Sequence, residues 1–247
     1  MGVGNTFLAQ LGDELELLRP HLRRVALKSG QVLCEPGERL RLVYFLESGA
    51  VSKLTVFADG SEIEGALIGR EGAVGATAAL GLTTAATRDV CHLIATAMTI
   101  GVAQLADAAA GSPRVRALLD SYCAFKMIQS IRNGACNARH PVEPRLCRWL
   151  LTCSDVLESE DIRLPQDLFA KMLGAQRTSV NPILRRFQAL GLIALGRARL
   201  TLLDRPGLEA RACECYRELA KYEALLRIND PPIAGASGGF GMRARRG

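Results

Sequence analysis

Positively charged side chains are concentrated in one stretch of the sequence, together with several amides. From Leu168 to Leu203 there is no Asp or Glu, and the cations are Lys171, Arg177, Arg185, Arg186, Arg197 and Arg199. The whole chain of 247 residues has a formal net charge of +6, so this stretch alone carries an equal excess. Guanidinium and amide groups can form paired hydrogen bonds with phosphates and base edges. The pattern therefore favours a polyanion as partner over a surface that is merely solvated.

Cysteine and histidine are the other side chains that could carry chemistry. The cysteines contain no C-x-x-C pair and are Cys34, Cys91, Cys123, Cys136, Cys147, Cys153, Cys213 and Cys215. Structural zinc sites usually combine short paired spacings, and Cys136 and His140 are followed by Pro141 with no second pair apparent. Cys213 and Cys215 would point in different directions on one helix. We therefore expect buried thiols and no metal, with a redox role for Cys213 and Cys215 as the alternative.

Three successive parts of the chain must position these side chains. In the first, from about residue 22 to residue 105, short β-type runs alternate with turn signals such as Asp59-Gly60, which predicts an antiparallel barrel or jelly roll. This part contains no enzyme motif, and no cysteine of the chain has a histidine beside it in a Gly-bounded turn. No apolar run approaches the roughly 18 residues of a membrane span. We expect a soluble, cytoplasmic protein that is not an enzyme and has no membrane partner.

The second part is a predicted long helix. It starts at Ser112-Pro113 and runs without Gly or Pro to Asn133, because proline suits the first turn of a helix. Its apolar surface would consist of Val115, Leu118, Leu119, Tyr122, Phe125, Ile128, Gln129 and Ile131. This surface is wider than a two-stranded seam, so the helix can cover the barrel and also contact a copy of itself. We expect a homodimer, with one long core helix in a monomer as the alternative.

The third part predicts two helices joined by a tight turn. Pro165 begins the first helix, and Gly174 can take the positive φ that ends it. The inward-facing residues are Leu168, Phe169, Met172 and Leu173 in the first helix, and Val180, Ile183, Leu184, Phe187 and Leu190 in the second. Ala170, Gly174 and Val180 stand where a helix-turn-helix needs a small residue, a turn residue and a branched contact. An ordinary helical hairpin would explain the apolar residues but not the acid-free face.

The start of the second helix carries the side chains expected to contact DNA in a major groove. They are Gln176, Arg177, Thr178, Ser179, Asn181 and Arg185, whose types suit base edges and phosphates. Pro182 disfavours helical geometry at Asn181, so we expect a kink or a reset first turn. Beyond this helix, two short strands turning at Gly196 would form a wing, with Arg197 and Arg199 placed for phosphate contact.

From roughly Leu17 to Leu226 the sequence resembles bacterial transcription regulators of the Crp/Fnr superfamily. The stretches LKSGQVLCEPGE, VYFLESGAVS and LPQDLFAKMLGAQRTSVNPILRRFQALGLI carry the resemblance. It implies an α+β architecture: an antiparallel jelly-roll sensor domain over 1–111, a dimerisation helix over 112–137 and a winged helix-turn-helix over 138–229. The composition of residues 230–247 predicts a disordered basic tail. The resemblance also implies that a homodimer binds double-stranded DNA at an inverted repeat, and it allows a contact with RNA polymerase.

The resemblance also locates an effector pocket. Nucleotide-binding members share a Gly-Glu pair, which holds the ribose hydroxyl, and an Arg-Ser/Thr pair, which binds the cyclic phosphate. Here these places read Gly75-Ala76 and Arg88-Asp89. A carboxylate about 4 Å from the phosphate would be repelled by roughly 4 kcal/mol at an effective dielectric constant near 20. We expect a degenerate pocket, no binding of cyclic AMP and no cofactor.

Other cofactors and functions of this superfamily find less support in the sequence. The N-terminal cysteine cluster of Fnr-type members is missing, and His21, His92 and His140 are isolated, so we expect neither an iron–sulfur cluster nor a haem. The alternative function is a ligand- or redox-sensing regulatory module whose C-terminal domain contacts protein. The acid-free stretch and the wing count against that alternative.

Overall fold

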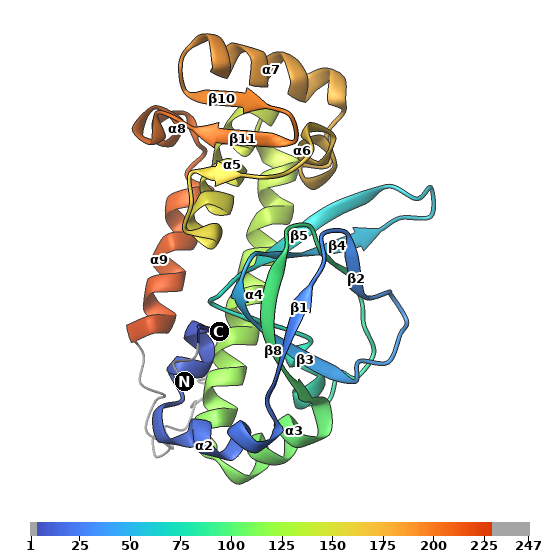
Figure 1. The fold of residues 1–247 in the computed structure, drawn as a ribbon. Helices are drawn as coiled ribbons and strands as arrows, with labels where there is room; N and C mark the ends of the chain where they lie inside the picture. Colours follow the sequence, from blue (N-terminus) through green and yellow to red (C-terminus); the bar gives the residue numbers. More distant parts are fainter. Residues whose placement is uncertain (1–3, 229–247) are drawn as a thin grey trace, which may run out of the picture.

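The structure is a computed structural model that describes residues 4–228 (Figure 1). Its first part is a barrel of two antiparallel four-stranded sheets, with strand orders β1-β8-β3-β6 and β2-β7-β4-β5. The strands are β1 (Arg23–Leu27), β2 (Gln31–Cys34), β3 (Leu42–Ser48), β4 (Val51–Val56), β5 (Glu62–Ile68), β6 (Ala73–Val74), β7 (Arg88–Cys91) and β8 (Ala95–Gly101). The predicted antiparallel jelly roll is confirmed. The expected tail over 230–247 lies outside the described residues.

The hairpin of β4 and β5 projects from the barrel (Figure 1). Its turn is the predicted one: Gly60 has φ +79°, and its N–H donates to the carbonyl of Phe57 at 2.9 Å. The Asp59 carboxylate accepts from the N–H of Ser61, also at 2.9 Å. These local bonds fix the length of the hairpin and so determine which residues of β5 reach the rest of the molecule.

Short helical segments and two longer helices flank the barrel. Those before α4 are α1 (Thr6–Ala9), η1 (Gly12–Glu14), α2 (Leu15–Leu18), η2 (Arg19–His21), η3 (Ala76–Leu80) and α3 (Val102–Gly111). The long helix α4 (Pro113–Arg139) extends beyond the expected end at residue 137, and the Ser112 hydroxyl caps it by accepting from the N–H of Val115 at 3.3 Å. Buried Val115, Leu119 and Tyr122 pack α4 against the barrel side.

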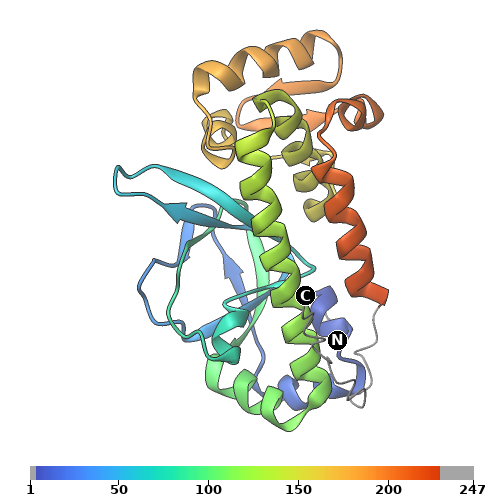
Figure 2. The same ribbon diagram turned by 180° about the vertical axis from the view of Figure 1, so that it is seen from behind.

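The third part is a winged helical unit at the other end of α4. Its elements are α5 (Val142–Leu157), β9 (Asp161–Ile162), α6 (Gln166–Met172), α7 (Arg177–Ala189), β10 (Ile193–Gly196), β11 (Arg199–Leu202), α8 (Arg205–Arg211) and α9 (Cys215–Ile228). The strands form a three-stranded sheet in the order β10-β11-β9. Helix α7 lies at the end of the molecule away from the barrel, and α9 runs beside α4 (Figures 1 and 2). None of the described helices is both long and apolar enough to cross a bilayer.

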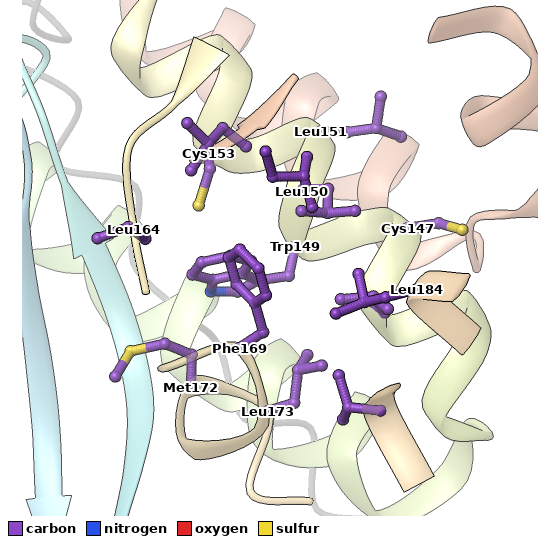
Figure 3. Close-up of a cluster of buried hydrophobic side chains, with 14 of the residues drawn as sticks. Cys147, Trp149, Leu150, Leu151, Cys153, Leu164, Phe169, Met172, Leu173 and Leu184 are labelled. Atoms are coloured by element: carbon purple, nitrogen blue, oxygen red, sulfur yellow. The ribbon is translucent and has the colours of Figure 1, made fainter. Parts of the chain in front are cut away.

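One hydrophobic cluster joins the barrel to the winged unit (Figure 3). The Trp149 and Phe169 rings form its middle, with their centroids 5.6 Å apart in an edge-on arrangement. The barrel contributes Ala50, Leu54, Leu67 and Val90 to the same cluster. The Trp149 Nε1–H also donates to the Glu64 carboxylate of β5 at 2.8 Å. The two parts therefore share one core instead of meeting only through a linker.

Two buried acids of the barrel have opposite electrostatic surroundings. Burial raises the pKa of Glu64, and the hydrogen bonds from Ser52 and Trp149 offset this only in part. Burial would also raise the pKa of Glu71, but the Lys126 ammonium 2.9 Å away and the Gly69 N–H hold it below its usual value. Relative to the unfolded chain, the fold therefore stabilises the protonated form of Glu64 and the ionised form of Glu71.

These directions give opposite effects on stability. Because the folded-state pKa of Glu64 is raised, the unfolded chain releases this proton first as the pH rises above about 4.5, and stability then falls. We expect Glu64→Gln to increase the free energy of unfolding near pH 8, because the amide can still accept from Trp149 and has no charge to bury. Glu71→Gln should lower it by about 1–3 kcal/mol, since it leaves Lys126 without its partner.

Urea unfolding of both variants from about pH 3 to pH 8 checks this pair. The effect of Glu71→Gln should keep its full size down to about pH 4.5 and shrink only below that, as the pH falls toward the lowered folded-state pKa of Glu71. If both substitutions shifted the midpoint in the same direction near pH 8, the assigned electrostatic surroundings would be wrong.

Candidate nucleic-acid interface and effector pocket

The helix-turn-helix is built as the sequence predicts, except that Leu190, expected to face inward, is 55 % exposed at the C-cap of α7. Gly174 has φ +57°, and Ala170 and Val180 are buried between α6 and α7. The N–H of Ala175 donates to the carbonyl of Ala170 at 2.9 Å, which closes the end of α6. A Cβ at Gly174 would lie 2.8 Å from the side chain of Ile63 in β5. Glycine is thus required here by backbone conformation and by the contact with the barrel.

The outer face of α7 is open to solvent. The predicted contact residues on it or just before it are all exposed: Gln176, Arg177, Thr178, Ser179, Asn181 and Arg185. The opposite face is buried through Val180, Leu184 and Phe187. With 3.6 residues per turn, this burial puts Thr178 and Arg185 near the middle of the outer face.

Pro182 is accommodated inside α7. The helix is continuous from Arg177 to Ala189. The first turn is therefore not reset, in contrast to one of the two expectations. Gln176 provides the N-cap with extended backbone angles (φ −76°, ψ 143°). Since Pro182 has no N–H, the carbonyl of Thr178 loses its usual partner four residues on. The proline lies on the solvent side, where water can satisfy that carbonyl.

The positive charge of this region is smaller than its sequence suggests. Acids from elsewhere in the chain fold back onto three of its cations, in the pairs Lys171–Glu62, Arg186–Glu143 and Arg199–Asp161. Arg199 and Asp161 are 2.5 Å apart across neighbouring strands of the wing. Among the described residues, Arg185 and Arg197 form no ion pair and are exposed. Arg185 and Arg197 are therefore two cations of this region that no acid of the described chain neutralises.

The expected effector pocket is a small cavity under α4. Gly75 takes φ +82° at the start of η3 and is followed by the buried Ala76. The cavity beside them has a volume of about 230 Å³; drug-sized ligands usually occupy roughly 300–1,000 Å³. It is lined by Gly75, Ala76, Thr77 and Lys53, and by Tyr122 and neighbouring residues of α4. Helix α4 thus covers this cavity.

Arg88 and Asp89 do not act together in this cavity. Arg88 pairs with Glu35 at 2.7 Å and with Glu62, and it does not line the cavity. Asp89 is 1 % exposed and pairs with Lys53 at 2.7 Å. The expectation of a carboxylate that opposes a bound phosphate is therefore wrong, because the Lys53 ammonium neutralises it. Successive residues of a strand face opposite sides, which explains why the two side chains separate.

Glu62 connects the barrel arginine to the winged unit. Its carboxylate pairs with Arg88 in β7 and with Lys171 in α6. Burial would raise the pKa of Glu62, but the hydrogen bonds from Lys171 and Arg88 keep it below its usual value. Sequence reasoning missed this cluster because its members are distant in the chain and belong to no common motif. Only the docking of the β4–β5 hairpin brings them together.

A second group that sequence reasoning missed joins the end of α4 to the start of α9. Cys136 and His140 at the end of α4 lie beside Cys213 and Cys215, with all four ligand-type atoms within 4.8 Å of one another. The prediction that Cys213 and Cys215 point in different directions is wrong. Cys213 precedes α9 and Cys215 is its first residue, so the turn between them lets both face α4. His140 is likewise not isolated.

Comparisons with known proteins agree with this architecture. Residues 24–99 match the model of the cyclic nucleotide-binding domain, and residues 144–211 match the Crp-like helix-turn-helix domain. Together these matches cover more than half of the chain. The HTH-type transcriptional regulator Cmr of Mycobacterium tuberculosis (strain CDC 1551 / Oshkosh) is 49% identical over 51 residues, or 21% of this chain. That match spans 21% of Cmr, about a fifth of its length.

Solved structures share the fold over most of the chain. The c-di-GMP responsive global regulator CLP of Xanthomonas campestris superimposes with a TM-score of 0.65 at 19% identity, covering 77% of this chain and 98% of CLP. FixK2 of Bradyrhizobium japonicum gives a TM-score of 0.69 at 16% identity, with 78% and 98% covered. At such identities the likeness concerns the fold alone.

The cavity geometry leads to a prediction about cyclic nucleotides. Cyclic AMP and cyclic GMP should bind no more tightly than about millimolar, a free energy of only about 4 kcal/mol. Arg88 is engaged by Glu35 and Glu62 outside the cavity, and Ala76 has no acceptor for a ribose hydroxyl. Isothermal titration calorimetry on the full chain measures this directly. A micromolar dissociation constant that disappears in Arg88→Ala would contradict it.

Proposed function

Because the chain belongs to the Crp/Fnr superfamily of transcription regulators, we propose that it binds an inverted-repeat operator as a homodimer, with α7 in the major groove. The observation that carries this proposal is the exposed, acid-free outer face of α7 at the free end of the molecule (Figure 1). A recognition helix must present its N-terminal residues to base edges without steric obstruction. No other described element stands between α7 and solvent on that side.

Base reading and phosphate contact fall to different elements in this proposal. Arg177, Thr178 and Asn181 lie in the first turns of α7, where side chains of a recognition helix meet base edges. Arg197 lies at the exposed turn of the wing, next to Ala198 with φ +51°. A cation there suits the phosphate backbone, which positions the protein without carrying sequence information.

The proposed dimer interface is a stripe on the solvent side of α4. Exposed residues recur at alternating spacings of three and four along its second half: Ala124, Met127, Ile131, Gly134 and Ala138. Met127 is 59 % exposed and Ile131 65 %, although both are apolar. Heptad-like spacing of apolar and small residues is the pattern by which two helices pack along one seam. A second copy of α4 is the occupant that this spacing fits best.

The proposal divides the chain into the three parts expected from the sequence. Residues 1–111 form the sensor, 112–137 the dimerisation helix and 138–229 the DNA-binding unit. The small covered cavity and the outward arginine support a degenerate effector barrel, one that does not respond to cyclic mononucleotides.

Substitutions should separate base reading from phosphate contact. Arg177→Ala should weaken binding to the operator by about 1–3 kcal/mol and relax base preference, because a bidentate contact to guanine is lost. Arg197→Ala should weaken binding to all duplexes by the same factor. It should also lower the slope of log K against log salt concentration by about one. Fluorescence anisotropy with an operator found by genome-wide binding-site mapping, repeated over a range of salt, gives both quantities.

Arg199→Ala is the matched control on the wing. Because Asp161 already engages Arg199, its removal should change affinity less than Arg197→Ala does. The assignment of α7 as the reading helix would fail if Arg197→Ala altered base preference while Arg177→Ala did not.

The dimer stripe can be tested by adding charge to it. Met127→Glu combined with Ile131→Glu should convert the dimer to a folded monomer, because four carboxylates would meet at the seam. Sedimentation velocity, with circular dichroism to verify folding, measures the outcome. Ala103→Glu combined with Ala110→Glu on the exposed side of α3 adds the same charge away from the stripe and should leave the dimer intact. A wild-type monomer, or a charged variant that stays dimeric, would refute this interface.

A further inference from the structure

The thiol and imidazole groups of Cys136, His140, Cys213 and Cys215 form one compact cluster. The two Sγ atoms of Cys136 and Cys213 are 3.5 Å apart, and the Cys215 Sγ lies 3.8 Å from His140 Nδ1. All four ligand-type atoms lie within 4.8 Å of one another. Around one tetrahedral zinc ion with Zn–S bonds of about 2.3 Å, ligand sulfurs lie about 3.8 Å apart. The separations therefore fit a single ion held by four protein ligands.

The surroundings of His140 are those of a metal ligand. Its Nε2 lies 3.1 Å from a carboxylate oxygen of Glu214, while Nδ1 faces Cys215. Ligating histidines typically donate their second ring N–H to a carboxylate, which fixes the tautomer and leaves the other nitrogen free to bind. Glu214 stands between the two cysteines of the C-E-C turn, so one short segment supplies two thiolates and this supporting acid.

Two buried cations beside the cluster form no direct ion pair with a carboxylate of the described chain. They are Arg145 and Arg148, which are 6 % and 4 % exposed. The Nε atom of each is buried without a hydrogen-bond partner. Arg145 Nη1 donates at 2.9 Å to the carbonyl of Asn137, the residue after Cys136. Buried charges normally require compensation. Three thiolates with one divalent cation leave one net negative charge, which would compensate half of the two positive charges.

We propose that Cys136, His140, Cys213 and Cys215 bind one Zn²⁺ ion in a closed tetrahedral site. Zn²⁺ suits this set because structural zinc sites are commonly Cys₃His, with no open position. The ion joins the C-terminal end of α4 to the start of α9, two segments 77 residues apart at Cys136 and Cys213. It also lies next to Arg145, which donates to the carbonyl of Asn137 and to that of Leu173 at the end of α6.

The metal site would hold the dimerisation helix and the winged unit in a fixed relative orientation at their junction. His140 is the C-cap of α4, and α5 begins two residues later at Val142. Any rotation of the winged unit on α4 must bend the chain at this junction. Binding of four ligands from both sides of the junction would restrict that rotation. This consequence rests on the proposed function, whereas the metal site itself does not.

The experiment uses the full chain purified without added metal and measures zinc by mass spectrometry. We expect about one zinc per chain, and loss of about nine-tenths of it in Cys136→Ser combined with Cys213→Ser. Reconstitution with Co²⁺ should give the visible absorption of tetrahedral cobalt with thiolate charge-transfer bands. Cys123→Ser is the matched control, because Cys123 lies on the same helix outside the cluster.

A milder variant keeps the test valid if the cysteine variants fail to fold. Glu214→Gln changes an exposed side chain and should weaken zinc affinity about tenfold or more, measured by competition with a chromophoric chelator. Absence of zinc from the wild type together with no tetrahedral cobalt spectrum would overturn the proposal. So would a cobalt spectrum that persists in the double cysteine variant, or a Cys136–Cys213 disulfide in the freshly purified chain. None of these readouts depends on DNA binding.

Discussion

The packing of Trp149 against both parts of the molecule is the constraint on which the remaining structure depends. Its ring fills the middle of the core shared by barrel and winged unit, and its N–H must find a partner because it is buried. Glu64 of β5 provides that partner, which sets how the β4–β5 hairpin approaches α5. Once the position of the β4–β5 hairpin on α5 is fixed, Ile63 contacts the turn at Gly174 and Glu62 pairs with Lys171 of α6. The orientation of the helix-turn-helix on the barrel thus follows from one satisfied donor.

The sequence predicted those features that depend on local spacing. The helix-turn-helix was foreseen because Ala170, Gly174 and Val180 express its requirements within eleven residues, and all three behave as expected. The barrel was foreseen from alternating strands and turns, and the turn at Gly60 from its dipeptide. The predicted length of α4 was nearly correct, because Ser112 and Pro113 mark its start unambiguously.

What the sequence could not supply depends on contacts between distant segments. The sequence overstates the positive charge of residues 168–203. Three of their cations are neutralised by Glu62, Glu143 and Asp161, which lie outside this acid-free stretch. The pairing of Asp89 with Lys53 requires knowledge of which strands are neighbours. The cysteine cluster was missed for the same reason: each half looks like an unremarkable pair, and only the course of α9 beside α4 brings the halves together (Figures 1 and 2).

In the proposed DNA complex, Glu62 of the β4–β5 hairpin and a DNA phosphate would compete for the Lys171 ammonium group. The first helix of such a motif crosses the phosphate backbone, so Lys171 of α6 stands where a phosphate would attract it. Two partners that exclude each other at one group are linked reciprocally, and each weakens the other by the same factor. In that complex, a stronger Glu62–Lys171 pair would weaken DNA binding, and a bound duplex would weaken the pair. This ion pair would then couple the barrel to the DNA-binding end without a ligand in the cavity.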